Sequence, residues 1–138
     1  MSAKDIFHDA VKKGLEKESW VITDDPLRIR SGRIDMQIDL GAERMIAAEK
    51  GEEKIAVEIK SFISSSNISE FHTALGQFLN YRFALKKQQP ERFLYLAVPK
   101  TPYETFFQLP FVVDVIEHFQ LSLIVYDPND EVIVLWKK

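Results

Sequence analysis

Three residues on two apolar segments have side chains that suit a metal ion and a phosphate group. Asp39 lies in the segment I-D-M-Q-I-D-L, and Glu58 and Lys60 lie in I-A-V-E-I-K. Both segments alternate with a period of two, which predicts β-strands in which parity decides the face that each side chain occupies. Glu58 and Lys60 then project to the same side, about 7 Å apart along the strand. If the two strands pair, one face carries two carboxylates beside an ammonium group.

The apolar positions of each segment define the face that its strand buries. They are Ile34, Met36, Ile38 and Leu40 in the first segment, and Ile55, Val57 and Ile59 in the second. Asp35 and Gln37 share the polar face with Asp39, where they are either supporting groups or plain solvent-facing neighbours. The same pattern, taken for an isolated carboxylate, is typical of a solvated sheet face.

Paired carboxylates of this kind suit a divalent cation. Mg²⁺ prefers hard oxygen ligands and keeps much of its water, so one or two carboxylates and a substrate phosphate can hold it. One or two Mg²⁺ or Mn²⁺ ions can position a water, neutralise phosphoryl oxygens and stabilise a leaving alkoxide. Asp39 and Glu58 are therefore the predicted metal ligands, with the main-chain carbonyl of Ile59 as a further oxygen. Lys60 is predicted to orient the attacking water or to stabilise charge on the phosphate.

Length and composition favour a single domain over residues 1–138, since no internal repeat or linker interrupts the chain. No apolar run approaches the roughly 18 residues of a membrane span, and the charged N-terminus lacks a signal-peptide core. The absence of cysteine excludes disulfides and thiolate metal sites. These features lead us to expect a cytoplasmic protein with no membrane contact.

The formal net charge of −3 gives no support to non-specific binding of polyanions. Local cations matter more than the sum, because a bound divalent metal cancels part of an acidic cluster. Two basic clusters are present, Arg28, Arg30 and Arg33 in the first and Lys86, Lys87 and Arg92 in the second. Each is either a phosphate contact or a solvated surface.

Helical and strand periodicities alternate along the chain in an order that indicates the fold class. Ser2 with Asp5, and Asn67 with Glu70, are predicted helix caps, and Thr101 with Glu104 is a third. Predicted helices span about 3–18, 67–87 and 101–119, with Pro110 bending or dividing the last; predicted strands span 20–23, 34–40, 45–49, 54–62, 93–98, 121–126 and 131–136. This order predicts an α/β fold with a mixed central sheet flanked by helices.

The spacing of the three chemical residues resembles a known nuclease signature. Asp39, eighteen intervening residues, and then Glu58-Ile59-Lys60 are similar to the PD-(D/E)xK motif, with Ile38 in the place of the nominal proline. The order of helix, three-strand meander, helix and strand resembles the restriction-endonuclease-like core. Gln77 and Tyr81 resemble the Q-xxx-Y motif of RecB-like branches and share one helical face. The resemblance implies that both residues position DNA beside the metal.

A closer resemblance extends over nearly the whole chain. The blocks D-L-G-A-E-R-M-I-A-A-E-K-G, K-I-A-V-E-I-K-S-F, A-L-G-Q and L-I-V-Y-D-P are similar, in this order, to the XisH family. That family is the cyanobacterial fdxN-element excision controlling factor. The resemblance implies a role in DNA-element excision beside a recombinase and an XisI-type companion protein, and nucleases of this type commonly act as homodimers.

The residues leave three functions open. The first is a metal-dependent endonuclease, the second is a catalytically silent regulatory factor that acts through XisI or the recombinase, and the third is a metal-binding structural protein. Glu43 and Glu49 lie between the motif residues and are either additional carboxylates of the site or surface groups. His8 is either a polar group that faces the site or a helix-surface residue.

Overall fold

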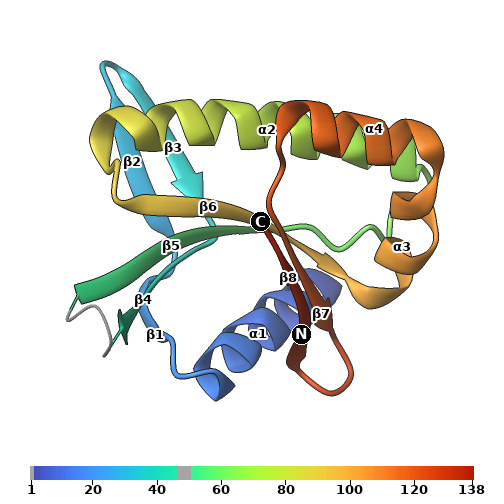
Figure 1. Cartoon of the computed structure of the whole chain (residues 1–138), viewed down its shortest axis with the longest axis horizontal. Coiled ribbons are helices and arrows are strands. Elements are labelled where there is room, and N and C mark those ends of the chain that lie inside the picture. Colours follow the sequence, from blue (N-terminus) through green and yellow to red (C-terminus); the bar gives the residue numbers. More distant parts are fainter. Residues whose placement is uncertain (1, 47–50) are drawn as a thin grey trace.

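The computed structural model describes residues 2–46 and 51–138. These residues form a six-stranded mixed sheet with helices on both faces, beside a two-stranded hairpin (Figure 1). The sheet order is β1-β4-β5-β6-β7-β8, in which the pairs β5-β6 and β6-β7 are parallel. The elements are α1 (Ala3–Lys17), β1 (Val21–Asp24), β2 (Leu27–Ser31), β3 (Ile34–Ile38), β4 (Leu40–Ile46), β5 (Gly51–Ile59), α2 (Asn67–Gln88), β6 (Arg92–Pro99), α3 (Lys100–Glu104), η1 (Phe106–Gln108), α4 (Pro110–Phe119), β7 (Leu123–Asp127) and β8 (Val132–Lys137). The predicted class, a mixed central sheet flanked by helices, is confirmed.

The sheet separates two apolar cores. Helix α1 covers one face, and α2 and α4 cover the other (Figure 1). Strand β6 contributes to both, because Leu94 and Leu96 pack on the α2 side while Tyr95 and Ala97 pack on the α1 side. Burial on both faces explains why this strand is a continuous apolar run rather than an alternating one.

Helix α1 forms where its cap and stripe predict it. The Ser2 hydroxyl accepts a hydrogen bond from the backbone N–H of Asp5, at 3.3 Å. Ala10, Val11 and Leu15 are fully buried against the sheet. Capping typically contributes about 1 kcal/mol, so the buried stripe is the larger contribution to the docking of this helix.

The single strand predicted over 34–40 is wrong, since the chain breaks at Asp39. Strand β3 ends at Ile38, which packs in the core under α2, whereas Leu40 opens β4 and packs in the core under α1. Ile38 and Leu40 therefore lie on opposite sides of the sheet and do not share a face. The alternating pattern continues across the break because each half faces an apolar core of its own.

Strand β2 was not predicted, because Pro26 reads as the end of a strand. Leu27 and Ile29 are buried, while Arg28 and Arg30 are exposed, so the alternation is present in the sequence. β2 pairs with β3 as a hairpin outside the main sheet. The antiparallel meander consequently consists of β1, β4 and β5, with this hairpin inserted after β1.

Helix α2 begins one residue away from its predicted cap. The Ser66 hydroxyl accepts from the backbone N–H of Ser69 at 3.2 Å, and Asn67 is the first helical residue. The predicted partner of the cap, Glu70, is therefore available for bonds elsewhere. The strand predicted from residue 54 begins earlier, since Gly51 already belongs to β5, and the end of the strand predicted over 45–49 lies outside the described residues.

The third helical region is divided, as the proline predicts. Pro110 is the first residue of α4, and the short helices α3 and η1 precede it. Thr101 is not the cap, because α3 starts at Lys100 after Pro99. Within the described residues, none of the helices combines the length and hydropathy that a bilayer span requires.

Candidate functional site

The carboxyl end of β5 brings together the three residues that the motif singles out. Asp39 lies in the kink between β3 and β4, and β4 pairs with β5 so that Leu40 stands opposite Val57. The Asp39 Oδ2 atom accepts from the backbone N–H of Ile59 at 2.8 Å. The backbone N–H of Asp39 in turn donates to Glu58 Oε1 at 3.3 Å.

The third member of this cluster is Lys60, which follows the last residue of β5. Its Nζ atom lies 3.6 Å from Glu58 Oε2. Its backbone N–H donates to Ala97 at 2.9 Å, and its carbonyl accepts from the Tyr126 hydroxyl at 3.2 Å. The lysine is thus fixed at both main-chain groups while its side chain reaches back to the carboxylate. We call Asp39, Glu58 and Lys60 the carboxylate–lysine cluster.

Burial makes Glu58 hold its proton more tightly than an exposed glutamate does. Glu58 is only 6% exposed. This burial, followed by repulsion from the Asp39 carboxylate, raises the pKa of Glu58 to about 7, although the Lys60 ammonium opposes the rise. A divalent cation between the carboxylates would remove the repulsion and favour the ionised form of both.

A small cavity of about 170 Å³ opens in front of the cluster. Asp39 and Lys60 line it, together with Phe7 and His8 of α1. Glu58 is buried and does not line the cavity. A ligand in the cavity would therefore meet Asp39 and Lys60 first.

Glu70 also lines this cavity, and sequence reasoning missed it there. Its Oε1 atom accepts from the backbone N–H of Phe62 at 3.1 Å, and its Oε2 atom accepts from the Ser64 hydroxyl at 3.2 Å. The carboxylate fixes the loop that leads from Lys60 to α2. The available signal was its position in the first turn of the helix after the motif lysine, which we interpreted as capping alone.

His8 lies at the cavity wall, in agreement with one of its two predicted roles. Its Nε2 atom lies 2.8 Å from Asp25 Oδ1, and the Lys12 Nζ atom lies 2.8 Å from Asp25 Oδ2. Burial of the Asp25 carboxyl acts against ionisation, but the hydrogen bonds from Lys12 and His8 prevail and lower its pKa. Asp25 thereby fixes the orientation of the imidazole at the mouth of the site.

Gln77 and Tyr81 lie one turn apart on α2. Burial raises the pKa of Tyr81, and the negative charges of Glu58 and Asp39 raise it further, so the phenol lies within electrostatic reach of the cluster. The Oε1 atom of Gln77 is buried and accepts no hydrogen bond from any described residue. A buried acceptor of this kind suits an ordered water or a substrate donor.

The remaining acidic candidates do not join the cluster. Glu43 pairs with Lys54 at 3.6 Å and with Arg92 at 3.5 Å, on the middle of β4. Asp35 lies on the exposed face of the hairpin, 3.7 Å from Arg30. Glu49 lies outside the described residues. Glu43 is therefore a structural ion-pair partner rather than an additional carboxylate of the site.

The oxygen ligands near the cluster decide whether the predicted metal site is complete. In residues 2–46 and 51–138, no three His, Asp or Glu side chains are grouped to share one ion. The predicted set requires only Asp39, Glu58 and a main-chain carbonyl, completed by water and phosphate. The mutual repulsion of the two carboxylates fits a hydrated Mg²⁺ or Mn²⁺ ion.

The fold and the cluster define a mixed α/β protein with a buried carboxylate–lysine site at the end of a central strand. Comparison with known families finds a match to the XisH protein family over residues 1–134. The chain belongs to the XisH family.

Two crystal structures resemble the chain closely. An XisH family protein from Nostoc punctiforme PCC 73102 is 54% identical, with a TM-score of 0.89, over 97% of this chain and 100% of that chain. An fdxN element excision controlling factor protein from Anabaena variabilis is 52% identical, with a TM-score of 0.89, over 97% of this chain and 99% of that chain. Among curated proteins, no match was found.

Proposed function

We propose that this protein acts on DNA as a divalent-metal-dependent endonuclease of the PD-(D/E)xK type, in the control of DNA-element excision. The observation that carries the proposal is the direct hydrogen bond between the Asp39 backbone and the Glu58 carboxylate, with Lys60 Nζ 3.6 Å from that carboxylate. The Anabaena variabilis relative, an fdxN element excision controlling factor protein, supports the role in excision control.

In this proposal Asp39 and Glu58 hold Mg²⁺ or Mn²⁺, with the Ile59 carbonyl as a further oxygen. The bound ion would supply charge neutralisation at the phosphate and an acidified water. Lys60 would orient that water or neutralise a phosphoryl oxygen. The neighbouring Glu58 carboxylate, which is almost fully buried, holds the ammonium near the cavity.

Substrate positioning falls to α2 in the same proposal. Tyr81 and Gln77 would contact the DNA strand beside the metal, and the unbonded Gln77 oxygen supports this role. Cleavage of both strands of a duplex would call for two copies of the site, so we expect a homodimer.

A second candidate function is a catalytically silent regulatory factor that works with an XisI-type companion and a recombinase. The observation in its favour is the restricted access to Glu58, which is buried and does not line the cavity of about 170 Å³. With a pKa of about 7, Glu58 also retains a proton on a large fraction of molecules at neutral pH unless a metal is bound.

Incubation with supercoiled plasmid in Mg²⁺ or Mn²⁺ distinguishes the two functions. We expect nicking that is lost in Lys60→Ala and retained in Lys54→Ala, a matched control on the same strand whose lysine pairs with Glu43 instead. Circular dichroism would show that both variants remain folded. Binding of DNA without cleavage of duplex, single-stranded or branched substrates in either metal would favour the regulatory factor.

A further inference from the structure

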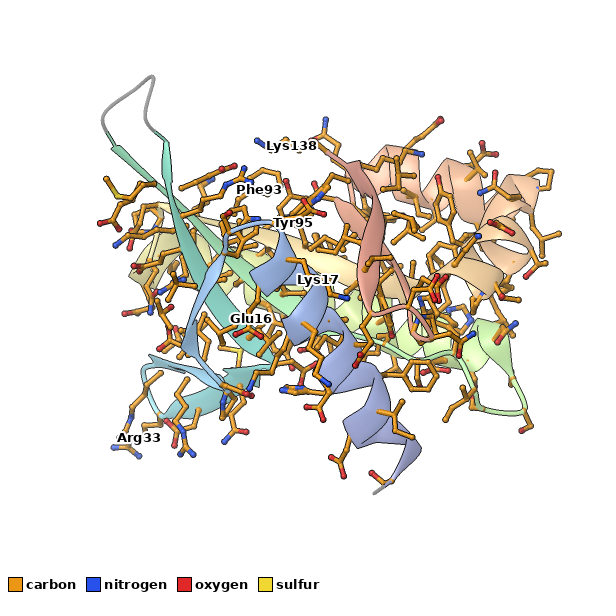
Figure 2. The ribbon with its side chains drawn as sticks, turned by 90° about the horizontal axis from the view of Figure 1, so that it is seen from below. Glu16, Lys17, Arg33, Phe93, Tyr95 and Lys138 are labelled. Carbon is orange, nitrogen blue, oxygen red and sulfur yellow. The ribbon has the colours of Figure 1, made fainter. Side chains whose placement is uncertain are left out.

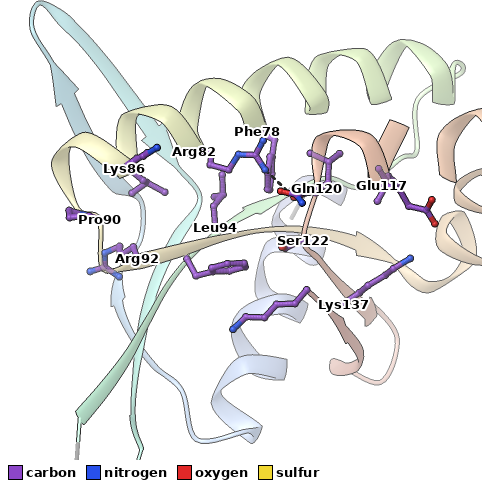
Figure 3. A pocket seen from close by; sticks show the side chains of 15 residues that line it. Phe78, Arg82, Lys86, Pro90, Arg92, Leu94, Glu117, Gln120, Ser122 and Lys137 are labelled. Atoms are coloured by element: carbon purple, nitrogen blue, oxygen red, sulfur yellow. Dashed lines mark hydrogen bonds between the residues drawn. The ribbon is translucent and has the colours of Figure 1, made fainter. Parts of the chain in front are cut away.

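A second and larger cavity lies on the α2 side of the sheet, away from the carboxylate–lysine cluster. It is an open groove of about 720 Å³ between α2, the end of α4, the start of β6 and the end of β8 (Figure 3). We call it the β6 groove. Its apolar lining comes from Phe78, Leu85, Phe93, Leu94, Ile116 and Leu121. Among the described residues, it shares no lining residue with the cavity at Asp39.

The β6 groove contains an open edge of the sheet. The Leu96 N–H donates to the Ser122 carbonyl, whereas the Ala97 carbonyl accepts from Lys60, so neighbouring residues of β6 face opposite strands. By this alternation, the main-chain groups of Leu94 face the side of β7. Strand β7 begins only at Leu123, opposite Leu96.

Two main-chain groups therefore point into the groove, namely the N–H of Leu94 and the carbonyl of Arg92, whereas the carbonyl of Leu94 faces Ser122. Outside the strand ladders, no hydrogen bond from a described residue reaches either of the two. Unpaired edge groups of this kind are a template for another strand. Here they lie within an apolar recess that would exclude water from the new hydrogen bonds.

The rim of the groove is basic although the chain as a whole is acidic. Arg82 and Lys86 approach from α2, and Lys137 approaches from the end of β8 (Figure 3). Lys138, which follows β8, also lines the groove. Glu117 is the carboxylate that lines the groove. The net charge of the chain is −3, so this local excess of cations is a feature of the groove rather than of the whole surface.

Arg92 differs from the lysines of the rim because its charge is already engaged. Its guanidinium bonds to Asp24 at 3.2 Å, to the Ile55 carbonyl at 3.0 Å and to Gln89 at 2.6 Å. It fixes the start of β6. Arg82 is also engaged, because it donates to the Gln120 carbonyl at 3.0 Å, whereas Lys86, Lys137 and Lys138 are exposed. Figure 2 shows Lys138 beside Phe93, where its Nζ atom lies 4.8 Å from the ring centroid.

We propose that the β6 groove binds a short, extended, acidic segment of a partner protein, which adds to β6 as a strand. The segment's main chain would pair with Leu94, and every second side chain would enter the apolar floor around Phe78 and Ile116. The intervening acidic side chains would point to the opposite face of the sheet, where Lys138 lies over Phe93. This inference goes beyond the proposed nuclease function and does not depend on it.

The combination of features selects a peptide over other anionic ligands. A nucleic acid needs cations along its backbone but has no use for an unpaired strand edge. A small anion uses the charges but leaves the apolar floor and the edge uncovered. Ser122 already lies along β6 opposite Tyr95, so the uncovered stretch runs from Arg92 to Leu94 and spans about 10 Å.

NMR spectroscopy of the ¹⁵N-labelled protein tests the proposal with a defined probe. The probe is a six-residue acetylated and amidated peptide of alternating glutamate and valine. We expect it to shift the amides of Phe93, Leu94 and Ser122 and to slow hydrogen exchange at Leu94. Lys138→Glu should weaken binding about tenfold, the equivalent of about 1.4 kcal/mol. Lys87→Glu should leave it unchanged, since this lysine of α2 does not line the groove.

Two further peptides separate strand addition from simple charge attraction. A lysine–valine peptide should not bind, and a glutamate–valine peptide with alternate amides N-methylated should lose binding. Equal binding of the methylated and unmethylated peptides would overturn the proposal. Equal binding by Lys138→Glu and wild type, or displacement of the peptide by an equimolar DNA duplex, would overturn it as well.

Discussion

The two ends of the parallel strands β5 and β6 carry opposite chemistry. At the carboxyl end of β5, two carboxylates and a lysine lie around a cavity of about 170 Å³, and Glu58 is 6% exposed. At the amino end of β6, an open groove of about 720 Å³ has an apolar floor and a basic rim. The larger cavity is therefore not the one that holds the reactive groups.

The difference follows from how each end is closed. Beyond β5, the chain folds back, so that Ser61 and Glu70 line the cluster's cavity together with Phe7 and His8 of α1. At the start of β6 the sheet edge is uncovered, because β7 first pairs with β6 at Leu96. A tight pocket with shifted proton affinity suits chemistry on a small group, whereas an uncovered edge suits a segment of another chain.

The largest expected effect concerns the proton on Glu58. Its pKa is raised from the ordinary 4.5 to about 7, so the folded chain binds this proton more tightly than the unfolded chain does. The resulting stability is fully present below about pH 4.5 and is lost as the pH rises through 7. The free energy of unfolding of the metal-free wild type should thus fall by up to about 3 kcal/mol between pH 5 and pH 8 through this group.

Urea unfolding of Glu58→Gln across the same range should lack this loss. Glu117→Gln, which changes an exposed carboxylate in the β6 groove, should follow wild type. Addition of Mg²⁺ should restore part of the stability of wild type at pH 8 and none in Glu58→Gln. If the free energy of unfolding fell equally with pH in Glu58→Gln and in wild type, Glu58 would not be the group that makes the buried end of β5 sensitive to pH.

The next effect concerns the metal ligands. Asp39→Asn removes one of the two charges that would bind the ion, and we expect Mn²⁺ affinity to fall about 100-fold by calorimetry, since even outer-shell changes cost 10- to 100-fold. Asp35→Asn, on the exposed face of the hairpin, should bind Mn²⁺ as wild type does. Unchanged binding in Asp39→Asn would show that the cluster is not the metal site.

Arg92 tests the opposite end of the two strands. Its side chain is 7% exposed and contacts Asp24 and Glu43 as well as the Ile55 carbonyl. Arg92→Met leaves these acceptors without their donor. It should lower the free energy of unfolding, measured in urea, by about 2 kcal/mol. Arg28→Met, on the exposed hairpin face, should cost less than about 0.5 kcal/mol. A loss for Arg92→Met as small as that for Arg28→Met would mean that the start of β6 is held by other contacts.

The smallest effect concerns substrate positioning. Tyr81→Phe retains the ring in the core and removes only the hydroxyl, so stability should change little. If the phenol binds DNA in the ground state and the transition state alike, KM should rise about fivefold with kcat unchanged. Tyr103→Phe on α3 should leave both constants unchanged. A Tyr81→Phe variant with wild-type KM would assign Tyr81 to the core alone.

The alternation of apolar and polar residues along β5 correctly predicted which side chains share a face with Glu58. In β5, Ile55 and Val57 pack under α1 while Ala56 packs under α2, which confirms the predicted parity and places Glu58 on the α2 side. The helix with Gln77 and Tyr81 and the capped start of α1 were also predicted from local pattern. Such signals depend on neighbours within a few residues, which the sequence displays directly.

The break at Asp39 and the role of Glu70 could not be predicted in the same way. A period of two continues through Ile38 and Leu40, although these residues belong to different cores. Glu70 reads as a capping residue, yet its carboxylate bonds to Phe62 and Ser64 beside the cavity. In both cases a partner distant from the local pattern decides the outcome.

The sequence alone determined the fold class, the face on which Glu58 lies and the residue types of the carboxylate–lysine cluster, because periodicity and side-chain chemistry are local properties. Only the tertiary structure decided that Glu58 is buried, that Glu70 and His8 line the cavity, and that Lys86, Leu94 and Lys137 share a groove. Burial and the meeting of remote segments depend on how β5, β6 and α2 pack, and that packing is fixed by the whole chain at once.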